Sequence, residues 1–224
     1  MKEVDNNITL ELEDLWKIYK NGDEVIHSLV NLNIAFKKGS LYIIHGPSGS
    51  GKSTLIRTIG LLEKITMGKI FIKGIDTSDL SQEKKNLLIK KEIGFVFRGP
   101  NLIPTLNTVE NLTLPMFNSD KEQAKKLLKL VGFTDYKKFP NDMSKEEEIR
   151  VSIARAMVNS HSIILADELT GDLHKSDADM IMQLLLELNR SENLTIIVTT
   201  NNTKLSKYSS LIEMEDGSLL NLKD

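Results

Sequence analysis

The residues best suited to chemistry form a glycine-rich loop in the N-terminal part of the chain. The loop consists of Gly46, Pro47, Ser48, Gly49, Ser50, Gly51, Lys52, Ser53 and Thr54, with the spacing of the G-x-x-x-x-G-K-S/T motif. Its glycines allow backbone amides to turn inward around a phosphate group. The motif also brings Lys52 to the β- and γ-phosphates and the Ser53 hydroxyl to Mg²⁺. The loop therefore predicts a nucleotide polyphosphate site rather than a plain Gly-Ser connection.

A second candidate lies where an apolar run at 162–166 ends in two carboxylates, Asp167 and Glu168. Asp167 can help to hold Mg²⁺, and Glu168 can accept a proton from an attacking water molecule. Alone, such an ending also fits a strand that simply meets solvent. The phosphate loop upstream favours the catalytic interpretation.

The segments that must position these groups alternate between strand and helix patterns. Apolar runs typical of buried parallel strands lie at 41–44, 93–97, 162–166 and 194–198. Helical stripes that we expect to face the core are formed by Ala124, Leu127, Leu128 and Val131, before a stop at Gly132, and by Met180, Ile181, Leu184, Leu185 and Leu188. Short strands are expected at 69–73, 211–214 and 219–222. This alternation predicts an α/β fold with a largely parallel, buried sheet.

Composition limits the classes of function. A length of 224 residues fits one globular domain, 1–224, with ordinary hydrophobic (40%) and charged (27%) fractions. With 29 basic and 31 acidic residues, the chain has no electrostatic footprint for nucleic acid. No apolar run approaches the ~20 residues of a membrane span, and the acidic N-terminus does not look like a secretory signal. We expect a cytoplasmic protein with no direct membrane insertion; the absence of cysteine neither supports nor opposes this.

Beyond the two motifs, nearly the whole chain resembles the ATP-binding subunit of an ABC transporter. Tyr19, in the segment 16–20, falls where that family has an aromatic residue that stacks on adenine, although alone it fits a surface or core aromatic equally well. The segment 95–111, Phe-Val-Phe-Arg-Gly-Pro-Asn-Leu-Ile-Pro-Thr-Leu-Asn-Thr-Val-Glu-Asn, resembles the lipoprotein-releasing and macrolide-exporter branch.

The resemblance implies a P-loop NTPase fold with a RecA-like core, an antiparallel β subdomain and a helical subdomain roughly within 98–157. It implies ATP and Mg²⁺ as ligands and an integral membrane permease of an exporter as partner, with a second ABC ATPase subunit as a further candidate. The chain would then lie peripherally at the inner face of the cell membrane.

One departure from the family concerns its Leu-Ser-Gly-Gly-Gln signature, which caps the γ-phosphate held by the opposite subunit of a head-to-tail dimer. This chain has Met143-Ser144-Lys145-Glu146-Glu147, followed by Glu148. Bulk and negative charge then stand where phosphate should dock, so we expect a weak or absent contact across the dimer. The same residues form an S-x-x-E pattern, which predicts a capped helix start.

Three further departures affect residues that the family places near the reaction. Arg98 replaces a glutamine; because a guanidinium has donors only, it cannot ligate a metal, and it either pairs with phosphate or turns outward. Asn201 replaces the switch histidine and carries no positive charge, so it either contacts phosphate weakly or is a polar loop residue. Leu169 replaces a proline, and His174 replaces an aspartate at the end of the family's dimer-contacting loop, here 171–174. We expect His174 to be an exposed loop residue rather than a metal ligand.

Three hypotheses follow. The favoured one is an ATP-binding subunit that hydrolyses ATP slowly or not at all, with occupancy rather than turnover regulating a partner. The alternative is a fully active transport ATPase that powers a peptide or lipid exporter, because Lys52, Ser53, Asp167 and Glu168 are all present. A P-loop enzyme that acts on another acceptor is the third.

Overall fold

The computed structural model describes residues 5–99, 101–202, 205 and 208–222, so the N-terminal residues 1–4 and Pro100 of the exporter-like segment lie outside it. The strands are β1 (Ile8–Asn21), β2 (Glu24–Lys37), β3 (Leu41–His45), β4 (Met67–Ile72), β5 (Ile75–Asp76), β6 (Ile93–Val96), β7 (Ile163–Asp167), β8 (Thr195–Thr200), β9 (Ser210–Glu215) and β10 (Ser218–Leu222). The helices are α1 (Lys52–Ile59), α2 (Gln82–Glu92), α3 (Thr108–Thr113), α4 (Lys121–Leu130), the 3-10 turn η1 (Pro140–Asp142), α5 (Lys145–Arg155) and α6 (Lys175–Glu192).

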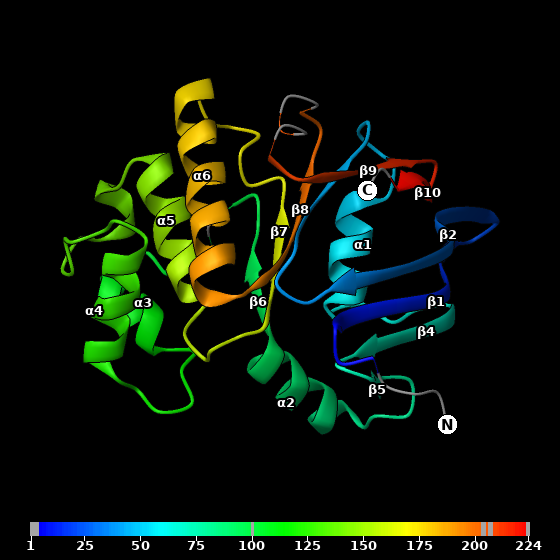
Figure 1. Ribbon diagram of the computed structural model, residues 1–224, viewed down its shortest axis with the longest axis horizontal. Helices are drawn as coiled ribbons and strands as arrows, with labels where there is room; N and C mark the ends of the chain where they lie inside the picture. Colours follow the sequence, from blue (N-terminus) through cyan, green and yellow to red (C-terminus); the bar gives the residue numbers. More distant parts are fainter. Residues whose placement is uncertain (1–4, 100, 203–204, 206–207, 223–224) are drawn as a thin grey trace.

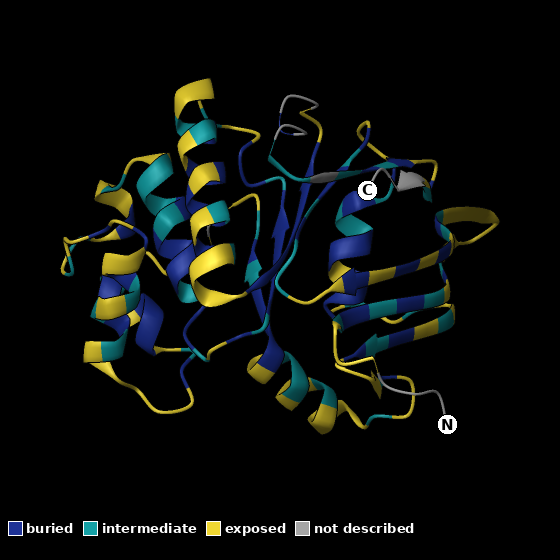
Figure 2. Ribbon diagram, viewed as in Figure 1, coloured by how far each residue is buried: buried dark blue, intermediate teal, exposed yellow. Residues whose placement is uncertain are grey.

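The described strands form two sheets. The six-stranded sheet has the order β10-β9-β3-β8-β7-β6, and its strands are parallel except for the antiparallel pair β9 and β10. The four-stranded sheet has the order β2-β1-β4-β5 and is antiparallel throughout. Figure 2 shows β7 and β8 buried along their length, whereas buried and exposed positions mix along β1 and β2. The first pattern is typical of a sheet covered on both faces, and the second of a half-exposed one.

Helix α1 lies between the two sheets (Figure 1). Leu55, Ile56 and Ile59 are completely buried and belong to one hydrophobic cluster with residues of both sheets. Their spacing puts them on one side of a helix of two turns, which is too short to be stable in water alone. Packing between the sheets therefore fixes α1 and the loop that precedes it.

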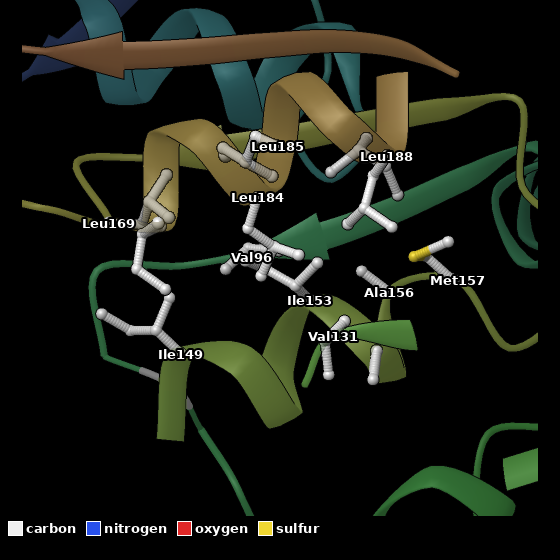
Figure 3. Packing of buried hydrophobic residues seen from close by; sticks show 14 of the residues in the cluster. Val96, Val131, Ile149, Ile153, Ala156, Met157, Leu169, Leu184, Leu185 and Leu188 are labelled. Atoms are coloured by element: carbon white, nitrogen blue, oxygen red, sulfur yellow. The ribbon is translucent and has the colours of Figure 1, made fainter. Parts of the chain in front are cut away.

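The opposite face of the six-stranded sheet is covered by α5 and α6, with α3 and α4 farther out (Figure 1). Figure 3 shows Leu184, Leu185 and Leu188 of α6 packed over Val96 and Ile153, all of them buried. A single buried Leu of this kind contributes about 2–5 kcal/mol relative to Ala. This second cluster fixes the ends of β6 and β7, where Arg98 and Glu168 follow.

The predicted α/β architecture with a buried, largely parallel sheet is confirmed, together with an antiparallel sheet. The apolar runs became β3, β6, β7 and β8 with ends shifted by one or two residues. In the α6 stripe, Met180 is an exception, since it is 43% exposed and does not face the core. A hairpin of two long strands, β1 and β2, was not recognised from its mixed pattern, although Asn21-Gly22 at its turn is a strong hairpin signal.

Candidate functional site

The phosphate loop connects the end of β3 to the start of α1, and its glycines are required by close backbone approaches. A Cβ at Gly46 would lie 2.0 Å from the Met214 carbonyl oxygen. Gly51 has φ 100°, and a Cβ there would lie 2.4 Å from the Ser28 carbonyl oxygen. Because Gly51 is the N-cap of α1, no side chain caps this helix, and its first turn has no acidic residue. The amides at this helix start therefore face no carboxylate of their own turn, the arrangement that suits an anion.

Lys52 is buried within the loop. Its ammonium donates hydrogen bonds to the carbonyl oxygens of Gly46 (2.8 Å) and Pro47 (2.7 Å), and the side chain is 3% exposed. Burial lowers the pKa of Lys52, while the carboxylates of Glu168 and Asp167 act in the opposite direction. Buried ammonium groups need oxygen partners, and here the loop provides them. A phosphate oxygen could replace these neutral carbonyls as a stronger acceptor.

Ser53 and Asp167 are 114 positions apart in the chain but lie in contact. The Ser53 hydroxyl donates to Asp167 Oδ1 (3.1 Å), and the Thr199 hydroxyl donates to the same oxygen (2.6 Å). Asp167 and Thr199 face each other on the neighbouring parallel strands β7 and β8. A carboxylate and two hydroxyls are hard oxygen donors of the kind that Mg²⁺ prefers, so the residues fit a magnesium ion. The sequence analysis does not identify Thr199 as the hydrogen-bond partner of Asp167. The position of Thr199 at the carboxyl end of the neighbouring strand is the signal that could have indicated this contact.

Glu168 follows directly and has a left-handed backbone, with φ 48°. Its amide donates to the Thr199 carbonyl oxygen at 3.1 Å. One carboxylate oxygen lies 3.8 Å from Lys52 Nζ and the other 3.5 Å from Arg98 Nη1. A non-glycine residue in this region costs of order 1–3 kcal/mol and marks a position that its surroundings hold in place.

Tyr19 lies near the end of β1, and the residue is 36% exposed. Its hydroxyl donates a short hydrogen bond to Glu63, and the Lys17 ammonium lies 4.7 Å from the ring centroid. Burial and the Glu63 carboxylate raise the pKa of Tyr19, while a hydrogen bond with Thr54 of the phosphate loop opposes them. The structure thus brings Tyr19 beside the loop. Glu63 is a second residue that sequence reasoning had missed.

The altered positions are placed as follows. The Arg98 side chain is 59% exposed, and its guanidinium is paired with Asp172 (3.1 Å) and Glu168 (3.5 Å). Asn201 is exposed and lines a cavity of about 740 Å³ with residues of the 171–174 loop and α6. His174 is exposed at the N-cap of α6, and the described residues contain no cluster of His, Cys, Asp and Glu that could hold a metal ion.

The segment that corresponds to the signature forms the start of α5, and its predicted capping box is confirmed. Glu147 N donates to the Ser144 hydroxyl at 3.2 Å, and Ser144 N donates to the Glu147 carboxylate at 2.8 Å. Glu147 also accepts from Lys138 (2.7 Å), and Glu146 is paired with Arg150. The negative charge at this helix start is therefore largely paired within the chain, which the sequence alone did not reveal.

Known proteins with this arrangement are transport ATPase cassettes. Residues 29–171 match the ABC transporter family. The ABC transporter ATP-binding protein MJ0796 of Methanocaldococcus jannaschii is 38% identical over 94% of each chain. A dimeric structure of MJ0796 bound to ADP and Pi superposes with a TM-score of 0.88, at 35% identity, over 96% of this chain and 98% of that one.

Two further relatives have more specific names. The lipoprotein-releasing system ATP-binding protein LolD of Buchnera aphidicola is 34% identical over 99% of this chain and 100% of its own length. The macrolide export ATP-binding/permease protein MacB of Mannheimia succiniciproducens is 35% identical over 94% of this chain, which spans 34% of that longer protein. Within the part of the chain that the structure covers, no helix is long and apolar enough to cross a bilayer.

Proposed function

The chain belongs to the ABC transporter family as the ATP-binding subunit of a transport complex, and we propose that this complex is an exporter in which the chain binds Mg-ATP and hydrolyses it slowly. The names of LolD and MacB support export. The altered residues at the signature and at Arg98, Asn201 and His174 support slow hydrolysis. The observation that carries nucleotide binding is the buried Lys52 ammonium, which donates to the carbonyl oxygens of Gly46 and Pro47 inside the loop and lies 3.8 Å from the Glu168 carboxylate.

Each site residue then has a role. The backbone of the loop surrounds the phosphates through Gly46, Pro47, Ser48, Gly49, Ser50, Gly51 and Thr54, and Lys52 binds their β- and γ-oxygens. Ser53 and Asp167 would hold Mg²⁺, which would neutralise charge on the phosphates. Tyr19 would stack on adenine. Glu168 would accept the proton of the attacking water as the catalytic base.

The alternative, a fully active transport ATPase, is favoured by one observation. Ser53 contacts Asp167 (3.1 Å) and Lys52 lies 3.8 Å from Glu168, so the groups for binding and proton transfer are assembled. Because the loss of one preorganised phosphate contact typically costs about a hundredfold or more in rate, the altered residues still favour slow turnover.

We infer an integral membrane permease as the partner, through which the chain would be held at the cytoplasmic face of the membrane. A second ABC ATPase subunit with an intact signature would complete a heterodimer, as the dimeric MJ0796 cassette suggests for two copies. We propose that nucleic acid is not a partner, because the 29 basic and 31 acidic residues give the chain no excess of positive charge. Residues 1–224 would act as a single ATP-binding domain, with the helical subdomain roughly within 98–157.

Thermal unfolding with and without Mg-ATP tests the binding site. A ligand at about 100 times its Kd stabilises the native state by about 2.7 kcal/mol. Lys52→Ala should remove most of that ATP-dependent gain, whereas Lys126→Ala, at an exposed position of α4, should retain it. Comparing each variant with and without ATP separates lost binding from lost intrinsic stability. An equal ATP-dependent gain in the Lys52→Ala protein would refute the assignment of this loop.

A further inference from the structure

Arg98 is held at the edge of the site by two carboxylates from another segment. Its Nη2 donates to Asp172 Oδ1 (3.1 Å) and its Nε to Asp172 Oδ2 (3.4 Å). This fork geometry fixes the plane of the guanidinium. Its remaining nitrogen, Nη1, then lies 3.5 Å from Glu168 Oε2. Asp172 thus anchors Arg98 so that it reaches Glu168.

The Glu168 carboxylate is consequently placed between two cations. Lys52 faces Oε1 at 3.8 Å and Arg98 faces Oε2 at 3.5 Å, and the side chain is only 18% exposed. Lys52 has stronger partners in the loop carbonyls, at 2.7 and 2.8 Å. Among the described residues, Arg98 is therefore the partner of the Glu168 carboxylate that comes from outside the phosphate loop.

Several of the altered positions line one cavity beside Arg98. A cavity of about 160 Å³ is lined by Arg98, Gly99, Lys145, Glu148, Leu169 and Asp172, among others. The hydrogen bond from Arg98 is the main cause that lowers the pKa of Asp172, and the positive charge of Lys145 lowers it further. Figure 3 shows Leu169 packed beside Ile149 of α5, which fixes one wall of this cavity. Three of the altered positions, Arg98, Lys145 and Leu169, thus line one cavity within a single subunit.

We propose that Arg98, anchored by Asp172, is a positioning residue that restrains Glu168 and slows hydrolysis. This rests on the proposed function. In the step concerned, the water oxygen bonds to the γ-phosphorus, its proton passes to Glu168, and the bond from the γ-phosphorus to ADP breaks with its electron pair retained by ADP. Glu168 must offer a carboxylate lone pair to that proton. The positive charge of Arg98, 3.5 Å from Oε2, attracts the same lone pair.

Steady-state ATPase kinetics of the full chain test the proposal. Arg98→Gln should raise kcat about two- to fivefold, the size expected for loss of a largely exposed ion pair, with KM changed by less than about twofold. Arg98→Lys retains the charge but not the fork, and should fall between the wild type and Arg98→Gln. Arg190→Gln, on the exposed side of α6, is the matched control and should leave kcat unchanged.

Asp172→Asn tests the anchor. Its kcat should rise less than that of Arg98→Gln, and the double variant should gain no more than Arg98→Gln alone, because both changes release the same contact. An unchanged or lower kcat in Arg98→Gln would overturn the restraint and assign Arg98 a supporting role instead. Failure of both wild type and Arg98→Gln to release phosphate would also overturn it, since something else would then limit the rate. Loss of ATP-dependent thermal stabilisation in the wild type would instead refute the proposed function.

Discussion

Two helix starts in this molecule meet the same electrostatic situation in different ways. Helix α1 begins after Gly51, with no capping side chain and no acidic residue in its first turn. Helix α5 begins with Ser144 and Glu147 capping each other, and its first turn contains three glutamates, of which Glu147 is one. Both have the partial positive charge of a helix N-terminus. The first leaves that charge to a ligand, whereas the second satisfies it with the chain's own carboxylates.

The comparison also corrects the expected reason for a weak signature. Because Glu146 is paired with Arg150 and Glu147 with Lys138, general repulsion of phosphate is smaller than the run of glutamates suggests. The obstruction that we propose is local. Side chains stand at positions 145 and 146, where the family has glycines, and the Glu147 carboxylate occupies the cap.

Filling the open helix start should have the largest effect. Gly51→Ala adds a Cβ that would lie 2.4 Å from the Ser28 carbonyl oxygen, at a backbone with φ 100°. We expect the free energy of unfolding to fall by about 2–4 kcal/mol, from overpacking and backbone strain, and ATP-dependent stabilisation to be lost. Thermal and denaturant unfolding measure both.

Gly22→Ala is the matched control for that variant. Gly22 also has positive φ (60°), but a Cβ there meets nothing within 4 Å. Gly22→Ala should lower the free energy of unfolding by about 1 kcal/mol, from backbone strain alone, and should leave ATP binding intact. If Gly51→Ala and Gly22→Ala lowered the free energy of unfolding equally, the phosphate loop would not be crowded at Gly51.

Removing the cap of the second helix should have a smaller effect. Ser144→Ala deletes an oxygen that accepts from Glu147 N, and should lower the free energy of unfolding by about 1 kcal/mol without changing ATP binding. Ser81→Ala at the start of α2 provides a comparison, since that cap has a longer bond (3.4 Å) and no capping box. Its cost in denaturant unfolding should be lower, and the reverse order would argue against the capping box as the stabilising feature.

The smallest effect concerns pH. The hydrogen bond from Lys138 lowers the pKa of Glu147, with partial burial opposing it and the Ser144 amide contributing further. A carboxyl whose pKa is lower in the folded state stabilises that state above its unfolded pKa, and this contribution is lost as the pH falls through the folded value. The difference in unfolding temperature between wild type and Glu147→Gln should therefore shrink below about pH 4.5, the ordinary value. We expect the Glu147–Lys138 pair to stabilise the fold by less than about 1 kcal/mol. A difference in unfolding temperature between wild type and Glu147→Gln that grows on acidification would contradict this pairing.

The buried sheet and the phosphate loop could be predicted because each leaves a local signal. Strands covered on both faces, such as β7 and β8, read as continuous apolar runs. Helix α2 was missed because its apolar residues 87–89 are consecutive rather than periodic, and Leu87 is 57% exposed. The Ser81 N-cap and the Gln, Glu, Lys and Leu residues that follow were the remaining signals for this half-exposed helix.

The ion pairs around Glu168 could not be predicted for a different reason. Arg98 and Asp172 are 74 positions apart, and their contact depends on how two loops leave β6 and β7. Sequence patterns specify elements better than the placement of loops between them. The motif residues were recognisable, but the partners that restrain them required the structure.

We propose that the ATP site of one copy is intact while the α5 helix start of another copy cannot complete it. Light scattering of the Glu168→Gln protein, with and without Mg-ATP, tests this most directly. We expect a monomer in both cases, and an ATP-dependent dimer once Lys145→Gly, Glu146→Gly and Glu147→Gln are added to remove the obstructing side chains. A stable ATP-induced dimer of Glu168→Gln with its native α5 start would contradict it.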